Sequence, residues 1–81
     1  MAKQPPEKVF RVGSVSASVF VHEVDGENGT RELRNVSLQR SYRDNGETKY
    51  AGSFGLAELP AVAMVVQLAT DYVASKEAEV K

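Results

Sequence analysis

Few residues of this chain are of the types that carry out enzyme chemistry. His22 is the single histidine, cysteine is absent, and no serine stands in the sequence setting of an activated nucleophile. General acid–base or nucleophilic catalysis needs at least two such groups held together. We therefore predict that the protein is not an enzyme, that it uses no cofactor, and that His22 is a polar strand residue.

Two further segments have the composition of ligand-binding loops but not their spacing. The segment Gly52-Ser53-Phe54-Gly55 lacks the lysine of a phosphate-binding loop, and residues 23–29 hold carboxylates in a pattern that does not fit a calcium loop. We expect the glycines of the first segment to let a strand leave the sheet. We expect the second segment to be a solvated turn, and we predict no metal site.

Polar residues recur at every second position of three predicted strands, so they should line one face of a sheet. They are Ser14, Ser16, Ser18, Phe20 and His22, then Asn35, Ser37, Gln39, Ser41 and Arg43, and finally Lys49, Ala51 and Ser53. Hydroxyls and amides beside a ring and cations suit a sugar–phosphate backbone and a stacked base. A solvated sheet face would show a similar pattern, although serine has poor strand propensity.

The first strand pattern covers residues 15–22, with its apolar side chains at odd-numbered positions from Val15 to Val21. Upstream, Phe10 and Val12 have the opposite parity, and Gly13 lies at the switch. A bulge or bend at Gly13 would let both apolar sets face one core and would divide the segment into two strands.

The second and third strand patterns, residues 32–43 and 47–54, flank the turn Asp44-Asn45-Gly46, which allows two registers. We expect a three-residue loop, which pairs Arg40 with Tyr50 and gathers the large apolar side chains on one face. A two-residue Asn45-Gly46 loop would instead pair Ser41 with Tyr50, placing Tyr50 and Phe54 on the polar face, because a one-residue slip reverses every side chain.

The C-terminal helix should begin near residues 57–60, where Pro60 suits a first turn, and end near residues 74–76. Between Leu59 and Val66 only Pro60 is not aliphatic, so this helix is apolar on every side and needs cover on more than one. We therefore predict a homodimer formed through the helix. The residues expected at this contact are Leu59, Val62, Val65, Val66, Ala69 and Tyr72.

The length predicts one domain, and the strand and helix patterns predict an α+β fold: a bent antiparallel sheet of three to four strands followed by one C-terminal helix. The 81 residues have a net charge of −1, with a mildly basic middle between Arg31 and Tyr50. We expect tails at residues 1–7 and 76–81 around a domain at 8–75. The lack of a signal-like run and of a spanning helix predicts a cytoplasmic protein with no membrane partner.

The polar strand block, the tight hairpin and a helix introduced by Glu58-Leu59-Pro60 together resemble the small transcriptional-coactivator family known as positive cofactor four and the related Whirly fold. The segments 38–43 and 53–60 also look like parts of small uncharacterised prokaryotic proteins. The family resemblance implies dimerisation through the helix and binding of single-stranded nucleic acid on the sheets.

On this basis we expect a homodimer that binds single-stranded DNA or RNA with little sequence preference and has no small-molecule substrate. Phosphate contacts are expected from Arg43 and Lys49, with Arg11 and Arg34 as further candidates. Phe20 would stack, and Ser37, Gln39 and Ser41 would form hydrogen bonds. The alternative is a protein-interaction module that uses the sheet face or its edge.

Overall fold

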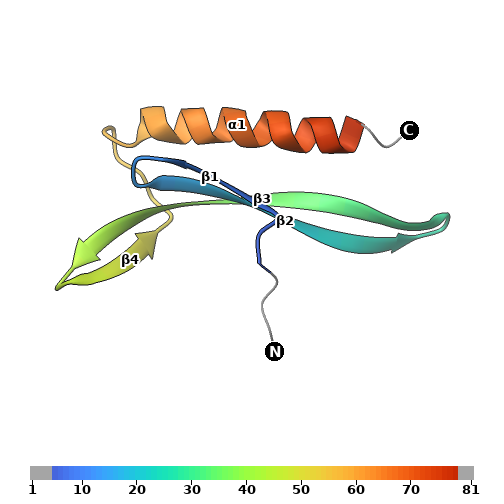
Figure 1. The fold of residues 1–81 in the computed structure, drawn as a ribbon, viewed down its shortest axis with the longest axis horizontal. Helices are drawn as coiled ribbons and strands as arrows, with labels where there is room; N and C mark the ends of the chain where they lie inside the picture. The colour runs from blue at the N-terminus through green and yellow to red at the C-terminus, as the bar shows by residue number, and fades with distance from the viewer. Residues whose placement is uncertain (1–4, 79–81) are drawn as a thin grey trace.

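The alternating residues of the first two thirds of the chain form four strands, and the aliphatic segment after them forms one helix (Figure 1). The computed structural model describes residues 5–78. The strands β1 (Lys8–Val12), β2 (Val15–Gly26), β3 (Gly29–Asp44) and β4 (Glu47–Ala51) pair antiparallel in chain order, and α1 (Leu59–Ala78) lies along one side of the sheet. The predicted α+β architecture, a sheet followed by one C-terminal helix, is confirmed.

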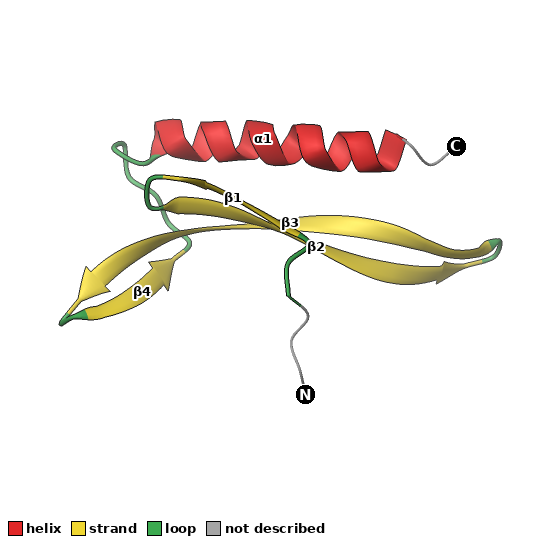
Figure 2. Cartoon of the chain, viewed as in Figure 1, coloured by secondary structure: helices red, strands yellow, loops and turns green. Residues whose placement is uncertain are grey.

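Strands β2 and β3 form a long two-stranded ribbon to which the other strands add only at one end (Figure 2). β1 pairs with residues 15–19 of β2, and β4 pairs with residues 40–44 of β3. The opposite end of the ribbon has no third strand, and the longest dimension of the chain is 50 Å. Both strands are longer than the sequence analysis predicted, because they continue to a turn at residues 27 and 28.

Gly13 produces a chain reversal, which is a tighter change of direction than the expected bend. Its φ is 61°, and Val12 pairs directly with Val15 across a two-residue turn. The reversal places Phe10 opposite Ala17. The parity switch at Gly13 therefore does bring both apolar sets onto one face, as predicted, and it divides the segment into two strands.

The expected three-residue loop between β3 and β4 is wrong. Asp44 pairs with Glu47 and Ser41 pairs with Tyr50, so Asn45 and Gly46 alone form the turn, with φ of 54° and 82°. Two positive φ angles are those of the tight hairpin turn whose twist matches that of its strands, and Asn-Gly is the preferred pair for it. This local preference outweighs the gathering of apolar residues that the longer loop would have allowed.

Phe54 does not follow the register of β4, because that strand ends at Ala51. In the connection to the helix, the partly buried Phe54 side chain packs against the core. The guanidinium of Arg40 donates a hydrogen bond from Nε to the carbonyl oxygen of Ser53 at 2.7 Å, which fixes this connection against β3. The slip thus moves Tyr50 to the polar face but leaves Phe54 in the core.

The core is small and is shared by β2 and α1. Val15, Ala17 and Val19 from β2 and Val65 and Ala69 from α1 are at most 2% exposed. Around them Phe10 meets Tyr72 edge to face, with ring centroids 5.9 Å apart.

The burial of Val65 and Ala69 inside their own chain corrects their predicted role at a helix–helix contact, because the sheet already covers them. Val62 and Tyr72 also pack against the core, whereas Leu59 and Val66 are 49% and 40% exposed. The homodimer itself stays a prediction, and its contact cannot centre on the buried pair.

The helix begins where Glu58 satisfies free backbone groups. The carbonyl oxygen of Glu58 accepts from Val62 N at 2.9 Å, and its carboxylate accepts from Gly55 N at 2.8 Å. This start agrees with the predicted one, whereas the helix continues to Ala78, past the expected end. Of the expected tails, residues 1–4 and 79–81 lie outside the described residues, and Glu7 is held by a hydrogen bond from its N–H to Val19 O at 2.7 Å.

Candidate nucleic-acid interface

The strand pairing divides the sheet into an inner face, which α1 partly covers, and an outer face on which no helix or strand of residues 5–78 lies. Alternation from the buried Val15, Ala17 and Val19 assigns every strand position to one of the two. The outer face consists of Val9 and Arg11 in β1, Ser16, Ser18, Phe20, His22 and Val24 in β2, Arg31, Leu33, Asn35, Ser37, Gln39, Ser41 and Arg43 in β3, and Thr48 and Tyr50 in β4.

Charge is divided unequally between the two faces of the sheet. The charged strand residues of the outer face are Arg11, Arg31 and Arg43, all basic. The carboxylates of the strands are all on the inner face, at Glu23, Asp25, Glu32, Asp44 and Glu47. The outer face therefore carries positive charge without a competing carboxylate at any strand position, although the whole chain has a net charge of −1.

Two aromatic rings lie on the outer face. Phe20 is half-buried opposite Asn35, and Tyr50 is 58% exposed opposite Ser41. Their partners on β3, Asn35 and Ser41, are six positions apart, which corresponds to about 20 Å along the strand. An exposed ring on a sheet is a surface on which a base can stack, so the outer face offers two such places with polar residues between them.

The polar residues between the two rings differ in their exposure to solvent. Ser37 is exposed, and Gln39 and Ser41 are half-buried beside it. The side-chain amide of Asn35 lies 2.7 Å from Nε2 of His22, so these two side chains form a hydrogen bond with each other. Of the predicted binding residues, Arg11, Phe20, Ser37, Gln39, Ser41 and Arg43 share the outer face.

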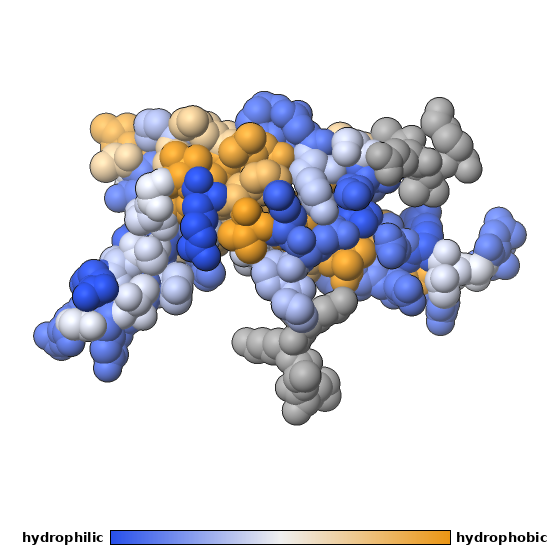
Figure 3. Space-filling model, viewed as in Figure 1, coloured by the Kyte–Doolittle hydropathy of each residue, from blue (hydrophilic) through white to orange (hydrophobic). Residues whose placement is uncertain are grey.

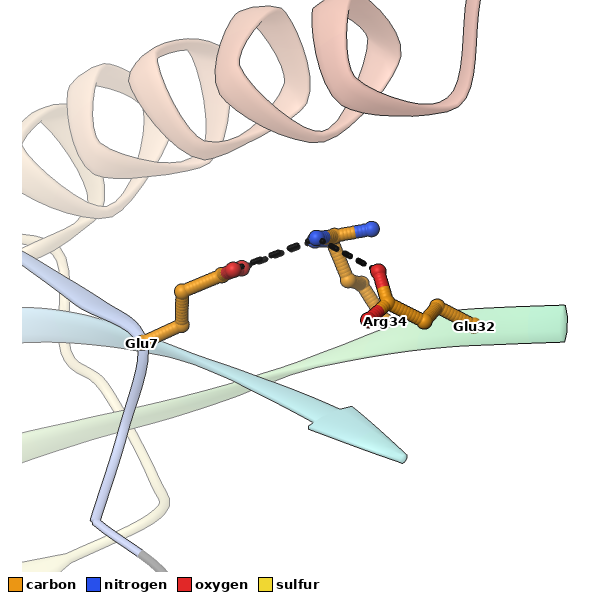
Figure 4. Close-up of polar contacts among 3 residues, drawn as sticks. All are labelled: Glu7, Glu32 and Arg34. Atoms are coloured by element: carbon orange, nitrogen blue, oxygen red, sulfur yellow. Dashed lines mark hydrogen bonds and ion pairs between the residues drawn. The ribbon is translucent and has the colours of Figure 1, made fainter. Parts of the chain in front are cut away.

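Arg34 is not part of this surface, which corrects its predicted role. It lies on the inner face, between Glu7 and Glu32 and below α1 (Figure 4). Its Nε and Nη2 donate to the two carboxylate oxygens of Glu7 at 2.7 and 3.1 Å, and Nη2 lies 3.3 Å from Glu32 Oε1. With 7% of its side chain exposed, this guanidinium ties the start of β1 to β3 and cannot contact a ligand on the outer face.

The ion pair between Arg34 and Glu7 shifts the pKa of both side chains. The two hydrogen bonds from Arg34 hold the pKa of the Glu7 carboxyl below its usual range, with smaller lowering contributions from Tyr72 and Lys76. Glu7 and Glu32 in turn raise the pKa of Arg34. Glu7 and Arg34 therefore form a structural ion pair, because each charge already has a partner within the fold.

Lys49 is also on the inner face, because the two-residue turn reverses β4 relative to the expected register. Its Nζ lies 3.2 Å from Asp44 Oδ2 in an exposed ion pair. The same reversal places Ala51 on the inner face and Tyr50 on the outer one. The predicted phosphate contact from Lys49 is thereby corrected, and Tyr50 takes its place on the candidate interface.

Among the charged and aromatic residues of the outer face, sequence reasoning missed two, Arg31 and Tyr50. Arg31 lies just before the strand start predicted at residue 32, and its alternation with Leu33 and Asn35 was the signal that the strand begins earlier. Tyr50 would have followed from the Asn45-Gly46 pair had the shorter turn been chosen.

Among residues 5–78, no group of three or more potential metal-ligating side chains lies together, and α1 is not apolar enough over its length to cross a membrane. Comparisons of the chain with protein-family models, with curated proteins and with solved structures find no match. The functional interpretation therefore rests on the geometry of the outer face.

Proposed function

We propose that the protein is a non-enzymatic, homodimeric cytoplasmic module that binds single-stranded DNA or RNA on the outer face with little sequence preference. The observation that carries this proposal is the separation of charge, with Arg11, Arg31 and Arg43 on a face whose strand positions hold no carboxylate. A polyanion would approach this face without repulsion from it.

The arrangement suits a single strand better than a duplex. An open sheet face with separated rings can bind phosphates through arginine and accept unpaired bases on Phe20 and Tyr50. Ser37, Gln39 and Ser41 would donate or accept hydrogen bonds to sugar and phosphate oxygens, which carry no sequence information. Low sequence preference follows because every base has a face that stacks.

A titration of labelled oligothymidine at increasing salt tests the proposal. Electrostatic binding should weaken linearly in log–log form, with a slope of about 0.7 for each phosphate contact on a single strand. Three arginine contacts would therefore give a slope of about 2. Absence of binding even at low salt would contradict the proposal and favour a protein-interaction module.

The two tyrosines beside the β3–β4 turn provide a matched test of the face. Tyr50→Ala should weaken binding by ~1–3 kcal/mol, the usual contribution of one stacked base, and should leave the salt slope unchanged. Tyr42→Ala removes the same kind of ring from the inner face, where Tyr42 is 40% exposed and lies below Arg40. Equal effects of the two substitutions would show that the ring contacts are not specific to the outer face.

A further inference from the structure

One edge of β3 is unpaired over most of its length. β2 accompanies β3 from Gly29 to Arg40, whereas β4 covers the opposite edge only from Arg40 to Asp44. Residues 29–39 consequently have no neighbouring strand on that edge among residues 5–78. A long open edge is a template for pairing with another strand.

The backbone groups that point to the open edge can be identified from the strand alternation. Ser41 N donates to Ser14 O at 2.9 Å, so odd-numbered residues of β3 direct their backbone groups toward β2. The even-numbered residues, Thr30, Glu32, Arg34, Val36 and Leu38, therefore direct theirs to the open edge. Each offers one N–H and one C=O there.

An apolar groove lies directly beside this edge. It has a volume of ≈ 470 Å³. Its lining is mainly Val36 and Leu38 of β3 and Val66, Thr70 and Val73 of α1, with Glu77 as its one charged residue. α1 packs mainly over β1 and β2, which leaves the inner side of β3 open, and Val36 and Val66 are each 40% exposed. The space-filling view shows apolar side chains reaching the surface between the helix and the sheet (Figure 3).

The other open edges are less suited to pairing. The ribbon edge of β2 beyond Val19 carries Glu23 and Asp25 on its inner face, and inward charges oppose pairing with a second copy. The outer edges of β1 and β4 are each five residues long. The open edge of β3 is longer, and its inner side chains at the groove are Val36 and Leu38, whereas Glu32 and Arg34 farther along it already form an ion pair with each other.

The chain exposes more surface than a compact monomer of the same mass would. It exposes 6170 Å², against about 4800 Å² expected for a compact monomer of this mass. Its radius of gyration is 15.2 Å, against about 12 Å expected for 81 residues. The excess area, about 1400 Å², is larger than the ~800 Å² that each partner buries in a standard interface.

We propose that a second copy of the chain pairs with this one through the open edge of β3, antiparallel and about a two-fold axis at Val36. A strand paired antiparallel with its own copy presents the same patch twice, as a closed dimer requires. At the axis the inward Val36 side chains of the two copies pack against each other, at the mouths of the two grooves. The result is one continuous sheet with both helices on the same side.

This geometry deepens the proposed function, on which the following consequence rests. The two-fold axis is perpendicular to the sheet, so the two outer faces join side by side and face the same way. A single strand would then follow a continuous surface with Arg11, Arg31 and Arg43 from each copy. The edge pairing itself does not depend on nucleic acid.

Sedimentation velocity of the full chain and of two lysine variants tests the inference. The wild type should be a dimer at micromolar concentration, and Val36→Lys should weaken dimerisation by more than about tenfold, because it places a charge in the groove. Met64→Lys is the matched control, since Met64 is an exposed apolar residue, at 57%, that does not line the groove. It should leave the dimer unchanged.

Amide hydrogen exchange of the wild type provides a second readout that does not depend on the folding of a variant. In the dimer, the N–H groups of Arg34, Val36 and Leu38 should be protected, and dilution should remove this protection while residues 33, 35 and 37 keep theirs. Fast exchange at the even positions in a dimer would overturn the edge pairing, as would loss of the dimer in Met64→Lys but not in Val36→Lys. A monomeric wild type that still binds oligothymidine would overturn the dimer and leave the binding face standing.

Discussion

The two faces of the β2–β3 ribbon are built from alternate residues of the same strands, yet they differ in burial and in charge pairing. On the inner face Val15, Ala17 and Val19 are buried under α1, and Arg34 is enclosed by two carboxylates. On the outer face Arg11 and Arg43 have no carboxylate partner among the described residues. The comparison indicates that folding uses the inner face and leaves the outer face free for a ligand.

The largest expected effect comes from breaking the inner face. Val65→Glu would bury an unpaired carboxylate where the side chain is fully buried, at a cost of about 3–5 kcal/mol. Because a domain of this size has little stability to lose, the far-UV circular dichroism spectrum should become that of an unfolded chain.

Met64→Glu is the control for this loss, since it places the same charge one residue earlier on the exposed side of α1. It should change the free energy of unfolding by less than about 0.5 kcal/mol. A folded Val65→Glu protein would show that α1 does not pack on the sheet through Val65.

A smaller loss is expected at the reversal that brings β1 onto the inner face. Gly13 has a φ of 61°, and a Cβ there would contact no atom within 4 Å, so the cost of Gly13→Val is conformational. We expect a destabilisation of ~1–2 kcal/mol, measured by urea denaturation, because a β-branched residue adopts this conformation poorly.

Gly52→Ala is the matched control for the reversal. Gly52 also has open space around its Cβ position but no positive φ, so its substitution should have little effect. Equal melting temperatures for Gly13→Val and the wild type would mean that the β1–β2 turn does not need its left-handed residue.

The smallest effect is a pH dependence located in the Glu7–Arg34 pair of the inner face. The pKa of Glu7 is lowered in the folded state by Arg34. Its contribution to stability is therefore present above the ordinary carboxyl pKa and is lost as the pH falls through the lowered value. Glu7→Gln should flatten the acid limb of stability against pH.

Removal of the partner charge completes this test. Arg34→Gln should flatten the same limb, and the double variant should flatten it no further than either single variant. Thermal melts of the four proteins between neutral and acid pH would provide the comparison, and additive effects would contradict a direct pair.

The sequence allowed the architecture to be predicted because its strongest local patterns agree with the fold. Alternation at Val15–Val21, the glycine at position 13 and the aliphatic run after Pro60 each determine an element directly. The far ends of β2 and β3 were harder to predict from the sequence. Val24 and Arg31 are isolated among turn-forming residues, and only their pairing with each other shows that the strands extend this far.

The candidate site was predicted in part for the same reason. The residues of β2 and β3 were assigned correctly to the outer face, because one alternation covers each strand. Lys49 and Tyr50 were each assigned to the wrong face, because their faces depend on the length of the turn at Asn45-Gly46, which differs by one residue between the two registers. Arg34 was misplaced because its partner Glu7 is distant in sequence, and the burial of Val65 depends on which side of a uniformly apolar helix meets the sheet.

The central claim, that the outer face binds a single strand, is tested most directly by removing charge from one face at a time and measuring the salt dependence of oligothymidine binding. Arg11→Ala with Arg43→Ala should reduce the salt slope by about 1.4, at ~0.7 for each contact. Lys49→Ala, which removes an exposed cation from the inner face, should leave the slope unchanged. A slope that falls with Lys49→Ala and not with the double arginine variant would contradict the account.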